Sequence, residues 1–154
     1  MSSAAHLDTP ASLPFSERIK QVPTVKTQRI FAFILLVVQA GITFTGSLVR
    51  VTGSGLGCNE WPLCHEGSLF PVRGAAPWVQ QFIEFGNRTL TFVVVAATIL
   101  VFYAVKKADR RKSLVDLAVA SGIGVIVQAV IGGISVKLDL QWWAVALHFL
   151  PSMI

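Results

Sequence analysis

The sequence predicts an all-α, polytopic membrane protein built as a helical bundle. Hydrophobic residues make up 53% of the 154 residues and charged residues only 14%, which is more apolar than a soluble domain of this size. The charges lie in short clusters separated by long apolar stretches. Such stretches are long enough to cross a hydrocarbon core of about 30 Å as helices. We therefore interpret the net charge of +5 as a membrane-orientation signal and expect no nucleic-acid partner.

The first helix is expected at about residues 30–50, where no charge occurs between Arg29 and Arg50. Residues 1–28 contain several prolines and serines and no long apolar run, so we interpret them as a disordered cytoplasmic tail. Gln39 lies near the middle of the helix. An amide in hydrocarbon needs a hydrogen-bond partner, so Gln39 is predicted to face other helices.

Three further helices complete the predicted membrane domain, residues 29–154. The second, about 78–105, starts at an interfacial tryptophan directly after a proline. The third is expected at about 115–136, and the fourth at 142–154, where the pair Trp142-Trp143 is the interfacial anchor at its start. The fourth helix would be only about 20 Å long, so its crossing is expected to be incomplete. Residues 51–77 form the long loop between the first two helices.

The distribution of basic residues predicts the orientation. Lysine and arginine concentrate before the first helix and in the 106–112 turn, whereas the 51–77 loop and the 137–141 turn hold few. Cytoplasmic loops carry the excess of positive charge. We therefore place the N-terminus in the cytoplasm and the 51–77 loop outside the cell membrane.

Cys58 and Cys64 lie in this outer loop, and three interpretations of the pair are open. Outside the cytoplasm a structural disulfide is the usual state. The pair is also suited to redox cycling. A metal site that adds His65 is the third interpretation, although two thiolates and one neighbouring imidazole make an incomplete tetrahedral set.

Glu84, Asn87 and Arg88 share one face of the second helix because they are three and four residues apart. The structural interpretation is an ion pair between Glu84 and Arg88. The functional interpretation is a site, since ionisable residues at the edge of a membrane span usually point into the bundle. His148 enters from the same side to a similar depth, and Arg50 is expected just above. A polar cluster beneath a glycine-rich loop suits a flat amphipathic ligand such as a haem or a quinone.

Four segments resemble the first half of the heme A synthase family: GSLVRVTGSGLGCNEWPLC (46–64), IEFGNR (83–88), QAVIGGISV (128–136) and HFL (148–150). The resemblance covers about residues 30–154, and the glycine–cysteine loop is its most specific part. It implies the N-terminal four-helix half of an eight-helix fold. It also implies an oxidoreductase that uses oxygen to convert the C8 methyl of heme O into the formyl group of heme A for cytochrome c oxidase.

The resemblance also implies roles for single residues. Glu84 corresponds to a catalytic glutamate thought essential for the oxidation, and His148 to a ligand of haem iron. At low dielectric we expect Glu84 to hold or relay a proton. Cys58 and Cys64 correspond to an outer-loop pair with a proposed redox role. The expected cofactors are haem, as heme b or as the substrate heme O, and its iron.

Asn87 departs from the family pattern, which has a histidine three residues after the glutamate. A carboxamide is a poor iron ligand beside an imidazole, so we expect His148 to be the single axial ligand and the opposite face of the iron to be open. Asn87, Arg50 and Arg88 are predicted to contact the cofactor in other ways.

The expected partners are the lipid bilayer, heme O, an electron donor, and either a heme O synthase or further helices that complete the bundle. The four-helix half alone is expected to have little activity. Two other functions stay open. A thiol–quinone oxidase would need a second cysteine pair to pass electrons onward. A non-catalytic haem-binding or assembly subunit of a respiratory complex would bind the cofactor without oxidising it.

Overall fold

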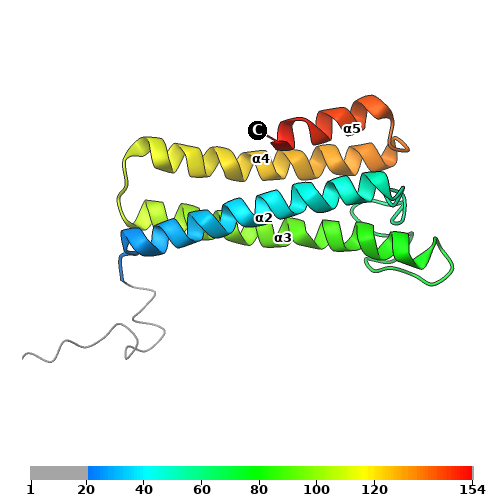
Figure 1. Ribbon diagram of the computed structural model, residues 1–154, viewed down its shortest axis with the longest axis horizontal. Helices are drawn as coiled ribbons and strands as arrows, with labels where there is room; N and C mark the ends of the chain where they lie inside the picture. Colours follow the sequence, from blue (N-terminus) through cyan, green and yellow to red (C-terminus); the bar gives the residue numbers. More distant parts are fainter. Residues whose placement is uncertain (1–20, 154) are drawn as a thin grey trace, which may run out of the picture.

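A computed structural model describes residues 21–153, and these form an all-helical bundle (Figure 1). The elements are α2 (Val25–Val51), α3 (Trp78–Lys107), α4 (Lys112–Lys137), α5 (Trp142–Phe149) and the short 3-10 helix η1 (Pro151–Met153). No strand occurs in this range, and its single β-bridge joins His65 to Ser68. The predicted fold class is confirmed.

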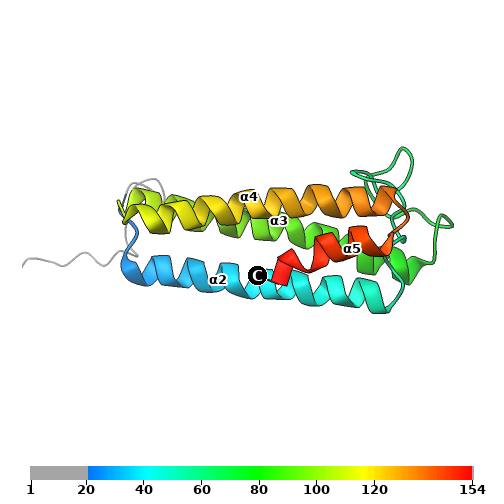
Figure 2. The ribbon, with the colours of Figure 1, turned by 90° about the horizontal axis from the view of Figure 1, so that it is seen from above.

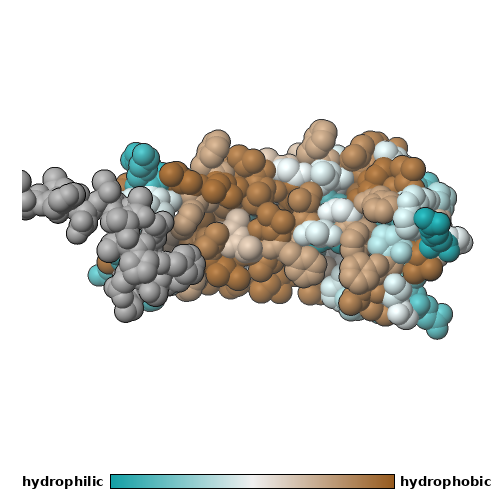
Figure 3. All heavy atoms as spheres, turned by 90° about the horizontal axis from the view of Figure 1, so that it is seen from below, coloured by the Kyte–Doolittle hydropathy of each residue, from teal (hydrophilic) through white to brown (hydrophobic). Residues whose placement is uncertain are grey.

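Three of the helices, α2, α3 and α4, are long and apolar enough to cross a membrane. Large apolar side chains project from them to the outside, for example Leu36, Phe44 and Phe92, which are 63%, 73% and 75% exposed. Figure 3 shows apolar residues over the middle of one face and polar residues towards its two ends. An apolar surface of this extent is typical of contact with lipid rather than water.

The three long helices run side by side along the molecule (Figures 1 and 2). We call the end that carries residues 52–77 the loop end, and the end that carries the 108–111 turn the basic end. The short α5 returns from the loop end alongside α4, and in Figure 2 it lies between α4 and α2. Segment 52–77 therefore closes the end of the bundle at which α5 begins.

Few side chains are buried between the long helices. Leu35, Val94 and Ala97 form the buried cluster between α2 and α3. Gln39 donates a hydrogen bond of 3.3 Å to Ser121 on α4, which confirms that this amide faces a neighbouring helix. A polar contact of this kind in hydrocarbon typically contributes about 1 kcal/mol.

The first helix begins earlier than predicted. α2 starts at Val25, inside the range 1–28 that the sequence analysis assigned to a disordered tail. Thr24 adopts an extended backbone conformation, and its hydroxyl accepts a hydrogen bond from the backbone N–H of Thr27. This is a normal N-cap, so residues 25–28 belong to the helix. Residues 1–20 of the predicted tail lie outside the described part of the chain.

The last α-helix ends earlier than predicted. α5 stops at Phe149, not at 154, and the 3-10 turn η1 follows it. Pro151 explains the change, because it lacks the backbone N–H that would continue the α-helical hydrogen bonds. Leu150 before it still has α-helical backbone angles and donates to the carbonyl of Ala146. α5 therefore occupies only the loop-end part of the bundle, with His148 in its last turn.

Candidate functional site

Segment 52–77 lies against the ends of α3 and α4 through two close glycine contacts. A Cβ atom at Gly57 would lie 2.5 Å from the backbone C and O of Gln80, in the first turn of α3. A Cβ at Gly55 would lie 2.6 Å from Cδ1 of Leu140, in the turn between α4 and α5. A side chain at Gly57 would meet backbone atoms and push the segment away from α3, whereas one at Gly55 would meet only the movable end of the Leu140 side chain.

Cys58 and Cys64 form a disulfide in this segment, and both are almost fully buried. The predicted disulfide is therefore present. The interpretation of a metal site with His65 is wrong, because both sulfur atoms are bonded to each other. The described residues also contain no group of three potential metal-ligating side chains.

Glu84 links α3 to the disulfide. Its Oε2 accepts a hydrogen bond of 2.8 Å from the backbone N–H of Cys58, and its Oε1 accepts one from Arg88. The predicted ion pair between Glu84 and Arg88 is thus confirmed, with side-chain exposures of 5% and 21%. Hydrogen bonds that involve charged groups are roughly twice as strong as neutral ones.

Arg88 extends this link over the whole cysteine segment. Its guanidinium donates hydrogen bonds to the backbone carbonyls of Cys58 at 2.7 Å, Glu60 at 2.7 Å and Leu63 at 2.9 Å. Loop carbonyls need such partners when they are buried. We call Cys58, Glu84 and Arg88 the loop clamp, since together they hold the disulfide segment on α3.

Gln81 provides a second attachment that the sequence analysis missed. Its side chain is fully buried, and its amide group donates to the carbonyls of Val72 and Ala76. Its Oε1 accepts from the N–H of Val72 and lies 2.8 Å from Nε2 of His65. The Val72 contact fixes which end of the amide is oxygen, so Nε2 of His65 carries a proton and donates it. Nδ1 of the same ring contacts Asn59.

The spacing of Gln81 from Glu84 and Arg88 in the sequence indicates its role. Gln81, Glu84 and Arg88 follow one another at spacings of three and four residues, which places them along one face of a helix. All three contact the same loop segment. A search for every polar residue on the Glu84 face would have found Gln81.

Asn87 contacts α2 instead of the loop. Its Oδ1 accepts a hydrogen bond of 2.7 Å from the hydroxyl of Thr45. The same oxygen lies 4.0 Å from the position that a Cβ at Gly46 would take. In this structure Asn87 therefore joins two helices, and its predicted contact with a cofactor stays a prediction.

His148 lies against α4 where that helix has a glycine. A Cβ at Gly132 would lie 2.9 Å from Cε1 and 3.2 Å from Nε2 of the imidazole. Nδ1 of His148 and Oε1 of Gln128 are buried atoms without a hydrogen-bond partner in the part of the chain described. The backbone of Gln128 lies near the ring, but not in hydrogen-bond geometry. Nδ1 of His148 therefore has no hydrogen-bond partner that a ligand would have to displace.

The predicted site residues thus fall into separate groups. Glu84, Arg88 and the disulfide are together in the loop clamp, whereas His148 belongs to the contact between α4 and α5. No hydrogen bond between described residues joins His148 to Glu84. Arg50 lies in the last turn of α2 with an exposed side chain, and within residues 21–153 it takes part in no hydrogen bond or ion pair that would tie it to the clamp.

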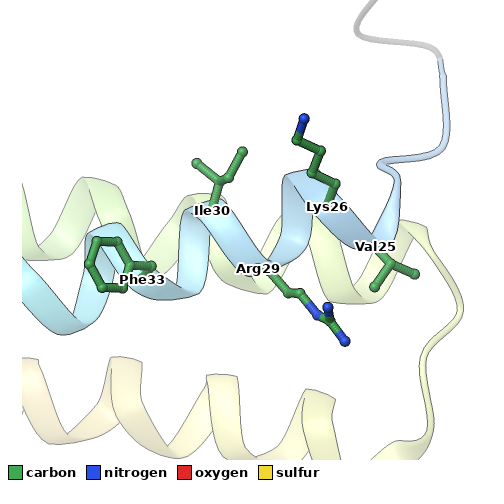
Figure 4. A pocket seen from close by; sticks show the side chains of 5 residues that line it. All are labelled: Val25, Lys26, Arg29, Ile30 and Phe33. Atoms are coloured by element: carbon green, nitrogen blue, oxygen red, sulfur yellow. The ribbon is translucent and has the colours of Figure 1, made fainter.

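Two surface hollows lie away from these groups. One, of about 310 Å³, is lined by Arg73, Gly74, Ala76 and Trp78. The other, of about 460 Å³, lies at the basic end along the first turns of α2 (Figure 4). There Lys26 and Arg29 project from different sides of the helix (Figure 4), so their charges do not converge on one point. Neither hollow includes Glu84 or His148.

Residues 29–154 match the cytochrome oxidase assembly protein family. The chain belongs to this family. Together with the three candidate spans, membership identifies it as a multi-pass membrane protein. The match covers α2 from its second turn onward, the disulfide segment and the remaining helices, and so it includes every residue of the loop clamp and His148.

Similar curated proteins carry the name heme A synthase. The one from Bacillus pumilus is 33% identical over 126 residues, which cover 81% of this chain and 39% of that protein. The one from Listeria welshimeri is 31% identical over 135 residues, covering 84% and 42%. The one from Bacillus licheniformis is 36% identical over 110 residues, covering 71% and 35%. The chain spans about two fifths of the length of these relatives, and no solved structure matches it.

Proposed function

We propose that this member of the cytochrome oxidase assembly family takes part in heme A synthesis, as the N-terminal half of a heme A synthase that oxidises the C8 methyl of heme O. The proposal rests on the environment of the His148 side chain. Its imidazole is half-buried, it lies on a glycine of α4, and one ring nitrogen is buried without a hydrogen bond. Buried polar atoms are normally satisfied, so a missing ligand explains this arrangement.

The residues present fit a haem with one protein ligand. Neutral imidazole nitrogen is a common axial ligand of haem iron, and Nδ1 of His148 has no hydrogen-bond partner among the described residues. Asn87 is occupied by the Thr45 hydroxyl and supplies only a carboxamide. When bound, haem iron supplies the oxygen-dependent oxidation chemistry, and His148 is the residue that would hold it.

The loop clamp has the supporting role in this proposal. The disulfide segment covers Glu84 and limits access of water to the loop end of α3. Both carboxylate oxygens of Glu84 accept hydrogen bonds, so a proton that reaches the carboxylate must replace one of these contacts. We propose that Glu84 holds or relays a proton in this position, while Arg88 keeps its charge and orientation.

The proposal includes a location and partners. We place the chain in the cell membrane with its N-terminus in the cytoplasm and the loop end outside, as the basic residues indicate. Because the chain spans about two fifths of its relatives' length, we propose that further helices complete the bundle. Heme O is the proposed substrate, and a heme O synthase and an electron donor are the proposed partners.

A haem-binding experiment tests the proposal. The chain is expressed in membranes, purified in nanodiscs and loaded with heme O, and its haem content and absorption spectrum are recorded. We expect His148→Ala to lose most of the bound haem. Leu147→Ala is the matched control, because its side chain is on the same helix and 57% exposed. An unchanged spectrum in the His148 variant would remove this residue from the iron.

A second experiment distinguishes an enzyme from a haem-holding subunit. Oxygen and a reductant are added to the haem-loaded chain, first alone and then together with a polypeptide that supplies the remaining helices found in the longer relatives. Formation of the formyl product supports the enzyme. Haem that stays bound but is never oxidised, even in the completed bundle, would leave a haem-holding assembly subunit instead.

A further inference from the structure

Trp61 reaches from the disulfide segment to α4. A Cβ atom at Gly133 would lie 2.3 Å from Cδ2 and 2.4 Å from Cε2 of its indole. Real Cβ atoms do not approach other atoms so closely, so the indole rests directly on the backbone of α4. Gly133 itself is buried, whereas Trp61 is only half-buried. Part of Trp61 is therefore not covered by this chain.

Trp61 and His148 contact consecutive glycines of α4. His148 lies on Gly132 and Trp61 on Gly133. Consecutive Cα atoms are about 3.8 Å apart, and their side-chain directions differ by about 100° in a helix of 3.6 residues per turn. An imidazole from α5 and an indole from the loop therefore occupy adjacent sides of the same turn of α4.

The loop clamp holds the indole in this place. Trp61 lies inside the ring that the disulfide closes between Cys58 and Cys64. Arg88 binds the carbonyls of Cys58, Glu60 and Leu63, which lie on both sides of Trp61 in the chain. The position of this indole thus depends on the disulfide and on Arg88, rather than on its neighbours in sequence alone.

We infer that Trp61 is a positioning residue for the haem that His148 is proposed to hold. Its indole is a flat apolar group on the same turn of α4 as the imidazole, and aromatic rings pack favourably against other flat π-systems. The inference rests on the proposed function. It adds a residue that contacts the porphyrin and not the iron, and that connects the disulfide segment to the haem.

The test measures how fast haem leaves the loaded chain, with apomyoglobin as the acceptor. We expect Trp61→Ala to raise the dissociation rate about tenfold without changing the iron ligand, and Trp61→Phe to have a smaller effect. Gly133→Ala displaces the indole, so it should resemble Trp61→Ala. Gly124→Ala on the same helix meets nothing within 4 Å and is the matched control.

A double variant makes the test specific. If Gly133→Ala acts through the indole, it should add nothing in a Trp61→Ala background. Equal rates for wild type, Trp61→Ala and Gly133→Ala, with the disulfide formed in each, would overturn the inference while leaving His148 as ligand. A wild-type chain that binds no haem, or keeps it without His148, would overturn the proposed function and this inference with it.

Discussion

The backbone N–H of Cys58 donates a hydrogen bond of 2.8 Å to the Glu84 carboxylate, so the disulfide and α3 are joined by one acidic side chain. The other carboxylate oxygen is bonded to Arg88, which in turn binds the carbonyl of Cys58. The three residues thus form a closed set of contacts that uses both the N–H and the C=O of Cys58. Removing any member leaves a buried or half-buried polar group without its partner, which is costly.

Glu84→Ala is expected to loosen the disulfide segment and to lower the free energy of unfolding by about 3 kcal/mol, because it leaves the Arg88 charge unpaired and the Cys58 N–H unsatisfied. Glu84→Gln keeps an acceptor and should cost less. Hydrogen exchange at residues 58–64 measures the loosening. Glu66→Gln is the control, since Glu66 is exposed in the same segment. Equal exchange in the Glu84 and Glu66 variants would contradict the role of the clamp.

Gly57→Ala is expected to displace the loop from α3, because the new methyl group would lie 2.5 Å from the backbone of Gln80. Backbone atoms cannot rotate away as a side chain can, so we expect faster proteolysis of segment 52–77 and a lower melting temperature. Gly41→Ala on α2 meets nothing within 4 Å and should be neutral or stabilising. A Gly57 variant that resists protease as well as Gly41→Ala would show that the contact is not close.

Thr45→Val is expected to cost about 1 kcal/mol, because it removes the only described hydrogen bond to the Asn87 side chain. Thr43→Val is the matched control on the same helix. The Thr43 hydroxyl donates within α2, to the carbonyl of Gln39, so its loss should not affect the contact between α2 and α3. Thermal unfolding in nanodiscs compares the two variants, and a larger loss for Thr43→Val would be the opposite of this expectation.

Asn87→His is expected to add a second imidazole ligand to the bound haem. The expectation rests on the family pattern, which has a histidine at this position, and two strong axial ligands would produce a low-spin spectrum. Absorption spectra of the loaded wild-type and Asn87→His chains show the change directly. In the Asn87→His, His148→Ala double variant only one ligand remains, and the low-spin signal should disappear. A spectrum unaffected by Asn87→His would place position 87 outside ligand distance.

Local sequence patterns were enough to predict the helices but not all of their ends. Runs of apolar residues between charges predicted four helices, because an uncharged helix is the stable way to place a backbone in hydrocarbon. The start of α2 at Val25 depends on the Thr24 cap, and the end of α5 depends on Pro151. Both signals are local in sequence. The charge of Arg29 nevertheless favoured a later start for α2, and the apolar run after Trp142 favoured a later end for α5.

The candidate site was predictable in part. Spacing along α3 predicted the contact between Glu84 and Arg88, since residues four apart meet on any helix. It did not predict that their partners are the N–H of Cys58 and three loop carbonyls. Hydrogen bonds to a loop backbone depend on the path of that loop, which side-chain identities alone do not specify.

The sequence by itself determined the membrane helices, the cysteine pair and the polar face of α3, because hydropathy and helical periodicity act over short distances along the chain. Only the tertiary structure decided that His148 packs on Gly132 and Trp61 on Gly133. Those contacts join α4 to α5 and to a loop some seventy residues earlier, and a glycine in sequence does not reveal which distant ring will occupy the space left by its missing side chain.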